Sequence, residues 1–229
     1  MALDAGSLAS ALTLEEQAGI ETILVTHSHL DHVNDLGSVC DVRTQQEGET
    51  LVIAGLKETI DALRTHFFND VLWPDFSRIA GVSGPIVEFR ELVPEVSVVF
   101  GDLAVLPVLV DHTVPSCGFL IGNGSPTLAY TGDTGPTERI WEVLNESPAV
   151  RALITEVSFP DRMGDLALQT GHLTPSSFAK EMTKVHRPPH HGIFVYGMKP
   201  VFAQEIVREM AALDLDGCQL LEGPVQLEV

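Results

Sequence analysis

The chain is poor in cysteine and has no long apolar segment, and each shortage excludes a class of protein. Its three cysteines, Cys40, Cys117 and Cys218, are scattered, so they provide neither the spacing of a zinc cluster nor a disulfide framework. A reducing compartment, the cytoplasm, is therefore the expected location. No apolar run reaches the roughly 18–20 residues of a membrane-spanning helix, and the first residues do not resemble a signal peptide. We expect no membrane partner.

Basic residues are also scarce. Lysine and arginine total 13 against 32 aspartates and glutamates, which gives a formal net charge of −19. A protein that binds a long nucleic-acid backbone normally presents a basic surface, and this composition offers none. A bound divalent ion can still attract one phosphate group against the overall charge. The composition therefore favours a small phosphodiester over a polynucleotide as the ligand.

The most informative residues that are present form the cluster His27, His29, Asp31 and His32. The cluster follows the apolar run 22–25, which predicts a buried strand of a parallel sheet, and open α/β sheets place their sites after such strands. His27 and His29 can bind one ion, while Asp31 and His32 can face a second. Imidazole and carboxylate groups suit zinc, and also manganese or iron, better than calcium. The alternative is a solvated, histidine-rich turn, which would suit a lone histidine better than this spacing.

Periodicity and turn residues predict mixed helices and strands over most of the chain. Thr174 is expected to cap a helix that continues through Pro175, and Pro136 is expected at the start of another. The aromatic residues Phe67, Trp73 and Phe76 indicate either core packing or a wall that stacks on a nucleobase. The expected helices are 33–46, 57–69, 136–145, 174–186 and 200–212, and the expected strands are 22–26, 51–54, 85–89, 96–100, 103–110, 117–122, 126–130, 151–156 and 193–196.

Two more polar residues follow predicted strands. His112 follows the apolar run that ends at Val110, and Asp133 follows strand 126–130. Alone, His112 would more often be a core histidine. Asp133 could simply stabilise the turn that it forms with Thr134 and Gly135. Their order behind the histidine cluster favours metal binding instead.

Together these motifs resemble the metallo-β-lactamase superfamily of binuclear hydrolases. The resemblance rests on His-x-His-x-Asp-His at 27–32, on Asp111-His112-Thr113 and on Thr131-Gly132-Asp133-Thr134. Further segments narrow it to the class II 3′,5′-cyclic-nucleotide phosphodiesterases and their bacterial relatives. They are Leu30 within the first motif, Trp73-Pro74-Asp75-Phe76, His112-Thr113-Val114-Pro115, Glu156-Val157-Ser158-Phe159-Pro160 and Gly171-His172-Leu173-Thr174-Pro175.

The resemblance implies an α/β fold, the four-layer αβ/βα sandwich of this superfamily, formed as one hydrolase domain over residues 1–229. In the family a hairpin usually precedes the Asp-x-Gly motif, which is Asp4-Ala5-Gly6 here. The chain is therefore expected to lack the first strands of the fold. The resemblance leaves the oligomeric state open, and a homodimer is one of the states that it allows.

The resemblance also implies a role for each motif residue. His27, His29 and His112 would hold a first ion, Asp31 and His32 a second, and Asp133 would bridge the two. One or two Zn²⁺ ions are expected, with Mn²⁺ or Fe²⁺ as alternatives. Between two ions a shared water loses its proton near neutral pH and attacks phosphorus, which opens cyclic AMP or cyclic GMP to the 5′-monophosphate. His172 would protonate the leaving 3′-oxygen and Glu156 would orient His172, so that His172, Glu156 and Asp31 are the catalytic candidates.

One position departs from the family pattern. Gly197 stands where a histidine would complete the second metal site, and glycine offers no ligand atom. His190 and His191 precede the strand that leads to Gly197, about 20 Å away if the run is extended, so they cannot replace that ligand. A weak second site is therefore expected. Two alternatives stay open: a tRNA 3′-processing endonuclease, and a non-catalytic metal- or nucleotide-binding protein derived from the enzyme.

Overall fold

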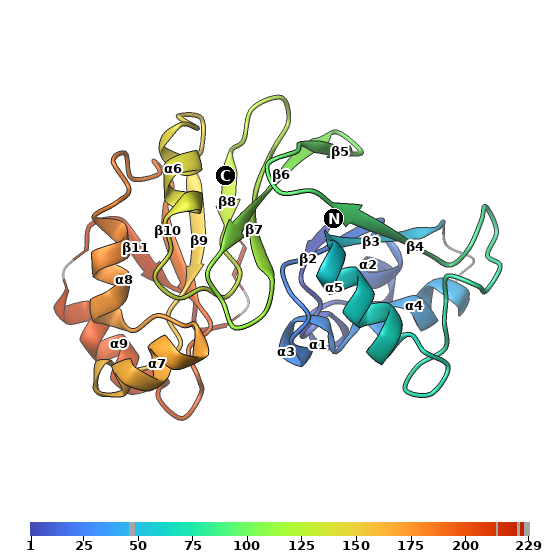
Figure 1. Ribbon diagram of the computed structural model, residues 1–229, viewed down its shortest axis with the longest axis horizontal. Coiled ribbons are helices and arrows are strands. Elements are labelled where there is room, and N and C mark those ends of the chain that lie inside the picture. Colours follow the sequence, from blue (N-terminus) through green and yellow to red (C-terminus); the bar gives the residue numbers. More distant parts are fainter. Residues whose placement is uncertain (46–48, 214, 224, 227–229) are drawn as a thin grey trace. The chain divides into compact units, whose positions relative to one another are not determined.

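The computed structural model describes residues 1–45, 49–213, 215–223 and 225–226, which form two compact units. Unit 1 comprises residues 1–93, and unit 2 comprises residues 94–229. Each unit has its own sheet and its own buried apolar core (Figure 1). That residues 1–229 act as one hydrolase domain stays a prediction.

Unit 1 is built on a four-stranded sheet in the order β1-β2-β3-β4, in which all neighbouring strands are parallel. Strands β2 and β3 are almost entirely apolar because they lie inside the sheet, where both faces are buried. The elements are β1 (Ala2–Leu3), α1 (Leu8–Ala11), α2 (Leu14–Ala18), β2 (Thr22–Val25), α3 (Leu30–Val33), α4 (Leu36–Gln45), β3 (Leu51–Leu56), α5 (Lys57–Ala62) with a π-helical turn (Leu63–Phe67), and β4 (Val87–Leu92).

The aromatic residues of unit 1 pack its core. Phe76 is 3% exposed, and its ring lies 6.2 Å from that of Phe68, centroid to centroid. Trp73 covers α4 at Gly37, where a Cβ would lie 2.6 Å from the indole ring. Only glycine allows this approach. The structure therefore supports the core interpretation of the aromatic residues over a wall that stacks on a nucleobase.

Unit 2 contains a seven-stranded sheet in the order β11-β10-β9-β8-β7-β6-β5. The strands from β5 to β8 pair antiparallel, and those from β8 to β11 pair parallel. The elements are β5 (Val98–Phe100), β6 (Leu103–Val110), β7 (Ser116–Gly122), β8 (Leu128–Tyr130), α6 (Arg139–Asn145), β9 (Ala152–Glu156), a 3₁₀ turn (Asp161–Met163), α7 (Gly164–Thr170), α8 (Pro175–Met182), β10 (Gly192–Tyr196), α9 (Ala203–Ala212) and β11 (Cys218–Leu220).

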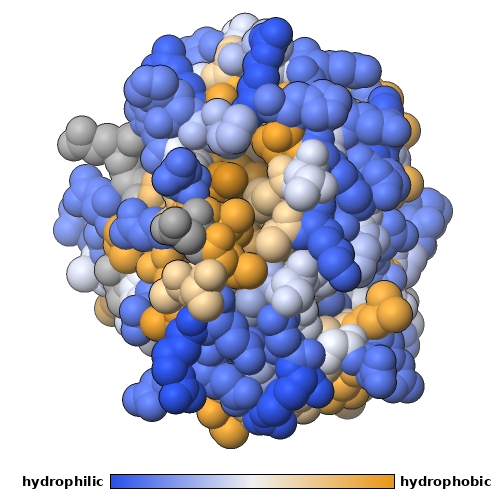
Figure 2. Space-filling view, turned by 90° about the vertical axis from the view of Figure 1, so that its left-hand side faces the viewer, coloured by the Kyte–Doolittle hydropathy of each residue, from blue (hydrophilic) through white to orange (hydrophobic). Residues whose placement is uncertain are grey.

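The core of unit 2 is formed by helix side chains that cover the sheet. Trp141 of α6, Phe178 of α8 and Ile206 of α9 are buried together with sheet residues. Apolar side chains also reach the surface on the face that Figure 2 shows. In this unit α9 and β11 line a pocket of about 440 Å³.

Every strand expected between residues 22 and 196 is present within a few residues of its predicted bounds, and the cap at Thr174 is confirmed by a capping box with Ser177. The helix predicted over 33–46 is instead two helices, α3 and α4, and residue 46 lies outside the described residues. The prediction for Pro136 is wrong, because α6 begins only at Arg139.

Tertiary hydrogen bonds explain the late start of α6. The Thr137 amide donates to Glu181 Oε2 at 3.0 Å, and the Thr137 carbonyl accepts from Lys184 Nζ at 2.8 Å. Both backbone groups of Thr137 are therefore used by α8 and the residues after it. These contacts hold Thr137 against α8 ahead of the helix, which begins at Arg139.

The three cysteines are free, and burial raises the pKa of the half-buried Cys218 thiol to about 11. Within the described part of the chain, no helix combines the length and the apolar character needed to cross a bilayer.

Candidate functional site

In unit 1 the histidine cluster occupies the loop and helix that follow β2. The fully buried His27 ring places Nδ1 2.9 Å from Thr26 Oγ1 and Nε2 3.0 Å from His29 Nδ1. Two nitrogens bound to one tetrahedral zinc ion at about 2.0–2.1 Å lie about 3.3 Å apart. The predicted pair His27 and His29 is therefore folded into a spacing that suits one ion.

His32 is oriented by a carboxylate far away in the sequence. Its Nδ1 lies 2.8 Å from Asp4 Oδ2, and Asp4 Oδ1 accepts the Thr26 backbone N–H at 2.8 Å. A hydrogen bond at Nδ1 makes Nε2 the ligand atom of the ring, in the manner of carboxylate–histidine pairs at metal sites. The sequence alone indicated no role for Asp4. Its only signal was the Asp-x-Gly motif directly after a short strand.

Gly6, the last residue of the Asp-x-Gly motif, is required by a close backbone contact. A Cβ on Gly6 would lie 1.6 Å from the carbonyl oxygen of Asp31, so only glycine lets the chain pass there. The Ala5 amide donates to the His32 carbonyl at 2.7 Å. These contacts hold α3 against the start of the chain. Asp31 itself is exposed at the first turn of α3.

In unit 2 three predicted residues come together. The potential ligand atoms of His112, Asp133 and His172 all lie within 4.8 Å of one another. His112 Nδ1 lies 2.8 Å from the Gly171 carbonyl, which makes Nε2 the ligand nitrogen. A Cβ on Gly171, whose φ is +66°, would lie 2.9 Å from His112 Nδ1. Glycine at 171 is therefore required for this approach.

Asp133 is placed by the loop that follows β8. The Gly135 amide donates to the Asp111 carbonyl at 2.7 Å, which ties this loop to the end of β6. Asp133 is 6% exposed, and its Oδ2 lies 3.9 Å from His172 Nδ1. The strand ends predicted to carry His112 and Asp133 therefore do lie side by side.

His172 and Glu156 form a hydrogen-bonded pair. His172 Nδ1 lies 2.8 Å from Oε1 of the fully buried Glu156, whose Oε2 has no hydrogen-bond partner among the described residues. Burial raises the pKa of Glu156. Burial lowers the pKa of His172, but the bond with Glu156 raises it, and the net shift is upward. This is the contact expected if Glu156 orients His172.

Gly197 follows β10 with a φ of +83°, in the left-handed region. A Cβ there would lie 3.4 Å from Glu156 Cβ and 3.5 Å from Ser158 Oγ. A side chain at position 197 would thus begin beside the Glu156–His172 pair. His190 and His191 precede β10 and are exposed, at the opposite end of the strand, as predicted.

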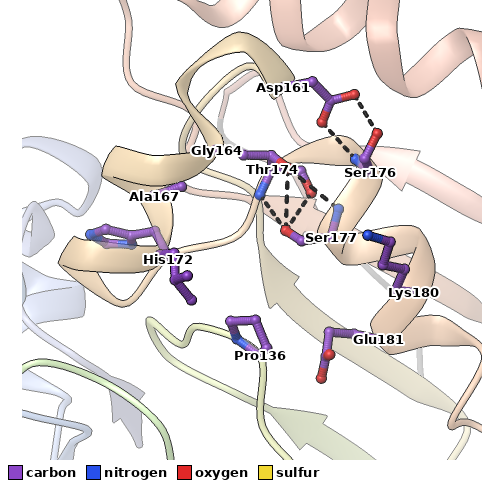
Figure 3. A pocket seen from close by; sticks show the side chains of 11 residues that line it. Pro136, Asp161, Gly164, Ala167, His172, Thr174, Ser176, Ser177, Lys180 and Glu181 are labelled. Atoms are coloured by element: carbon purple, nitrogen blue, oxygen red, sulfur yellow. Dashed lines mark hydrogen bonds between the residues drawn. The ribbon is translucent and has the colours of Figure 1, made fainter.

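A pocket of about 400 Å³ lies between α7, α8 and Pro136 (Figure 3). In the figure His172 lies at one end of the pocket, and Lys180 and Glu181 lie at the other. Clefts of this size bind small molecules. The pocket and the Glu156–His172 pair therefore share one residue, His172.

Each unit thus gathers its own share of the predicted residues. Unit 1 brings His27, His29 and His32 together, and unit 2 brings His112, Asp133 and His172 together. Imidazole and carboxylate donors with their outer hydrogen bonds in place fit Zn²⁺, Mn²⁺ or Fe²⁺. Which of these residues bind an ion stays a prediction.

Comparison with known proteins decides the family. Residues 4–192 match the beta-lactamase superfamily domain. The chain belongs to this superfamily. Over 223 residues it is 30% identical to a probable 3′,5′-cyclic-nucleotide phosphodiesterase of Yersinia pestis, a match that covers 86% of this chain and 62% of that relative. The chain therefore spans less than two thirds of the relative's length.

Two more similarities bear on the predictions. The structure of unliganded yeast PDE1 has a TM-score of 0.73 at 22% identity, over 89% of this chain and 66% of that chain. Ribonuclease Z of a Mycobacterium species is 26% identical over 52% of this chain and 44% of its own length. The resemblance to the metallo-β-lactamase superfamily and its cyclic-nucleotide phosphodiesterases is confirmed, and so is the α/β fold class.

Proposed function

We propose that the chain is a metal-dependent hydrolase that opens 3′,5′-cyclic nucleotides, cyclic AMP or cyclic GMP, to 5′-monophosphates. The observation that carries the proposal is the pair of His172 and buried Glu156 beside Asp133. A histidine that a carboxylate orients next to potential metal ligands can serve as the general acid for a leaving group. The name of the Yersinia relative supports the choice of substrate.

The metal ligands of the proposal are those that the sequence analysis assigned. His27, His29 and His112 are proposed for a first ion, Asp31 and His32 for a second, and Asp133 for both. The hydrogen bonds at Nδ1 of His27, His32 and His112 support the assignment, because each leaves Nε2 to face an ion. Bound divalent ions would lower the pKa of a water and offset charge on the phosphoryl oxygens.

The residues of the chain supply the remaining steps. The water, after it has released a proton to solvent, forms a bond from its oxygen to phosphorus as the bond from phosphorus to the 3′-oxygen breaks. The protonated His172 then gives its proton to that 3′-oxygen. Glu156 holds the imidazole through Nδ1, which leaves Nε2 to carry the transferred proton. Because Glu156 favours the imidazolium, His172 is charged at the start of the reaction over a wider pH range than a free histidine.

A small substrate suits the chain better than tRNA. The net charge of −19 opposes binding of a long polyanion, whereas a pocket of about 400 Å³ beside His172 has the size of a small-molecule site. Ribonuclease Z remains the enzymatic alternative because of its partial similarity. A precursor tRNA cleaved faster than cyclic AMP at physiological salt would favour it.

Gly197 favours a second candidate, a non-catalytic metal- or nucleotide-binding protein. Glycine provides no side-chain ligand beside Glu156, and loss of a ligand lowers the affinity for the second ion. The two candidates are separated by incubating the chain with cyclic AMP and excess zinc or manganese. Formation of 5′-AMP that a chelator abolishes supports the hydrolase. Thermal stabilisation by cyclic AMP without product supports the binding protein.

A further inference from the structure

A second pocket of unit 2 lies at the end of the sheet opposite to the candidate site. Its volume is about 640 Å³, and its lining includes Arg151, His190 and His191. These residues directly precede the parallel strands β9 and β10, whereas Glu156 and Gly197 stand at the other ends of the same strands. At about 3.3 Å per residue, Arg151 and Glu156 are roughly 16 Å apart. The pocket is therefore separate from the Glu156–His172 pair.

Backbone hydrogen bonds fix the basic residues at this end of the sheet. The Arg151 amide donates to the Thr127 carbonyl at 2.8 Å, and the His191 amide donates to the Arg151 carbonyl at 2.7 Å. The rings of His190 and His191 lie 5.4 Å apart, centroid to centroid. Arg151, His190 and His191 are thus carried at the starts of two neighbouring parallel strands.

The turn between β7 and β8 adds hydroxyl and amide groups. Asn123, Ser125 and Thr127 also line the pocket. A Cβ on Gly122 would lie 2.0 Å from the Ser125 carbonyl oxygen, so glycine at 122 is what allows the turn to fold back at this point. The backbone of this turn is therefore tightly folded, and its polar side chains line the same pocket as Arg151.

The charge of the pocket is opposite to that of the chain. The chain has 32 acidic residues, yet none of those that the structure describes lines this pocket. The exposed Arg78 and Arg162 and the half-buried Arg90 each form an ion pair with a carboxylate. Among the described residues Arg151 forms none, and neither does Arg187, which lies outside the lining. Among the described residues, no carboxylate therefore occupies the guanidinium donors of Arg151.

From this arrangement we propose that the pocket binds the phosphate group of a small molecule. A guanidinium offers paired N–H donors that match phosphate oxygens. Each imidazole carries an N–H donor even when neutral, and Asn, Ser and Thr add further donors. The volume accommodates a ligand of nucleotide size as well as inorganic phosphate. The site does not depend on the proposed function, because none of its residues belongs to the candidate metal or catalytic set.

The test is a titration of the full, metal-loaded chain with sodium phosphate at constant ionic strength. The imidazole C–H signals of His190 and His191 are followed by NMR, after assignment with His190→Gln and His191→Gln variants. Saturable shifts of both signals are expected. Arg151→Gln should weaken binding roughly tenfold or more, because it removes charge-assisted hydrogen bonds. Arg151→Lys keeps the charge but loses the paired donors, so its phosphate affinity should lie between those of the wild type and Arg151→Gln.

Arg187→Gln is the matched control, since it makes the same change in charge outside the pocket. Its affinity should equal that of the wild type. Equal weakening in Arg187→Gln and Arg151→Gln, or shifts that sodium chloride reproduces, would overturn the proposal. A parallel titration with 5′-AMP identifies the source of the phosphate. Tighter binding of 5′-AMP indicates a nucleotide, and binding of inorganic phosphate alone indicates the free ion.

If Arg151→Gln fails to fold, a Ser125→Ala variant tests the same pocket by calorimetry with inorganic phosphate. Ser125 lies in the exposed turn between β7 and β8, so its hydroxyl can be removed without a change in the core. Weaker binding than in the wild type is expected. Unchanged binding in both Ser125→Ala and the His190→Gln variant would contradict the proposal.

Discussion

Asp4 Oδ2 lies 2.8 Å from Nδ1 of His32, across 28 residues of sequence. Both side chains are buried, and Asp4 adopts a φ of +56°, which is uncommon for a residue with a Cβ. Strain of this kind is maintained when the surrounding contacts require it. The contact makes His32 Nε2 the nitrogen that would face an ion, and we propose that Asp4 positions His32 for the second metal site.

The first prediction concerns this contact. Asp4→Asn keeps the shape of the side chain but removes its charge, and we expect zinc affinity to fall about 10–100-fold. The affinity is measured by competition with a chromophoric chelator. Asp61→Asn is the control, because Asp61 is an exposed carboxylate paired with Lys57. An Asp4→Asn protein that binds zinc as tightly as the Asp61→Asn protein would show that the pair has no part in metal binding.

Gly6 gives a prediction about stability. Gly6→Ala would push a Cβ into the Asp31 carbonyl, and we expect the free energy of unfolding to fall by about 1–3 kcal/mol. Urea denaturation measures the change. Gly164→Ala is the matched control because no atom lies within 4 Å of its added Cβ. Equal stability of the two variants would mean that Asp31 does not pass Gly6 as closely as described.

The Glu156–His172 pair predicts a pH dependence. In the proposed mechanism His172 acts as an acid and Glu156 raises its pKa, so the contribution of His172 to the rate is present below that pKa and is lost as the pH rises through it. Glu156→Gln removes the carboxylate, so the falling limb of the kcat profile should move to lower pH. Glu142→Gln, a change at an exposed carboxylate of α6, should leave the limb in place. A limb that stays at the same pH in Glu156→Gln would remove Glu156 from this role.

Gly197 can be tested by adding the histidine that the family pattern has there. The φ of +83° disfavours any side chain, so Gly197→His and Gly197→Ala should both lose roughly 1–2 kcal/mol of stability. Only Gly197→His offers a new imidazole, and we expect it alone to increase the number of bound zinc ions. Equal metal content in the two variants would show that position 197 does not face the second ion.

The sequence predicted those parts of the molecule that depend on neighbouring residues. The histidine cluster follows β2 as expected, because an apolar run and the loop after it are local features. The cap at Thr174 was likewise predictable from the residues that follow it directly. The remaining candidate residues were predicted from the family resemblance, because no local pattern relates His112 to Asp133.

Contacts between distant residues could not be predicted. Pro136 was expected to begin a helix, but Glu181 and Lys184 take the backbone groups of Thr137 from more than 40 residues away. Asp4 was not assigned a role because its partner, His32, lies far along the chain. In both cases a buried carboxylate decides the local backbone, and the sequence does not show which donor it meets.

The proposed function is tested by measuring metal content and cyclic AMP hydrolysis together, on the wild-type chain and on Asp133→Ala. Asp133 is proposed to bind both ions, so the wild type should hold metal and form 5′-AMP, while Asp133→Ala should lose both. Folding of the variant is checked by circular dichroism. A folded Asp133→Ala protein with full zinc content, or a metal-loaded wild type without turnover, would contradict the account.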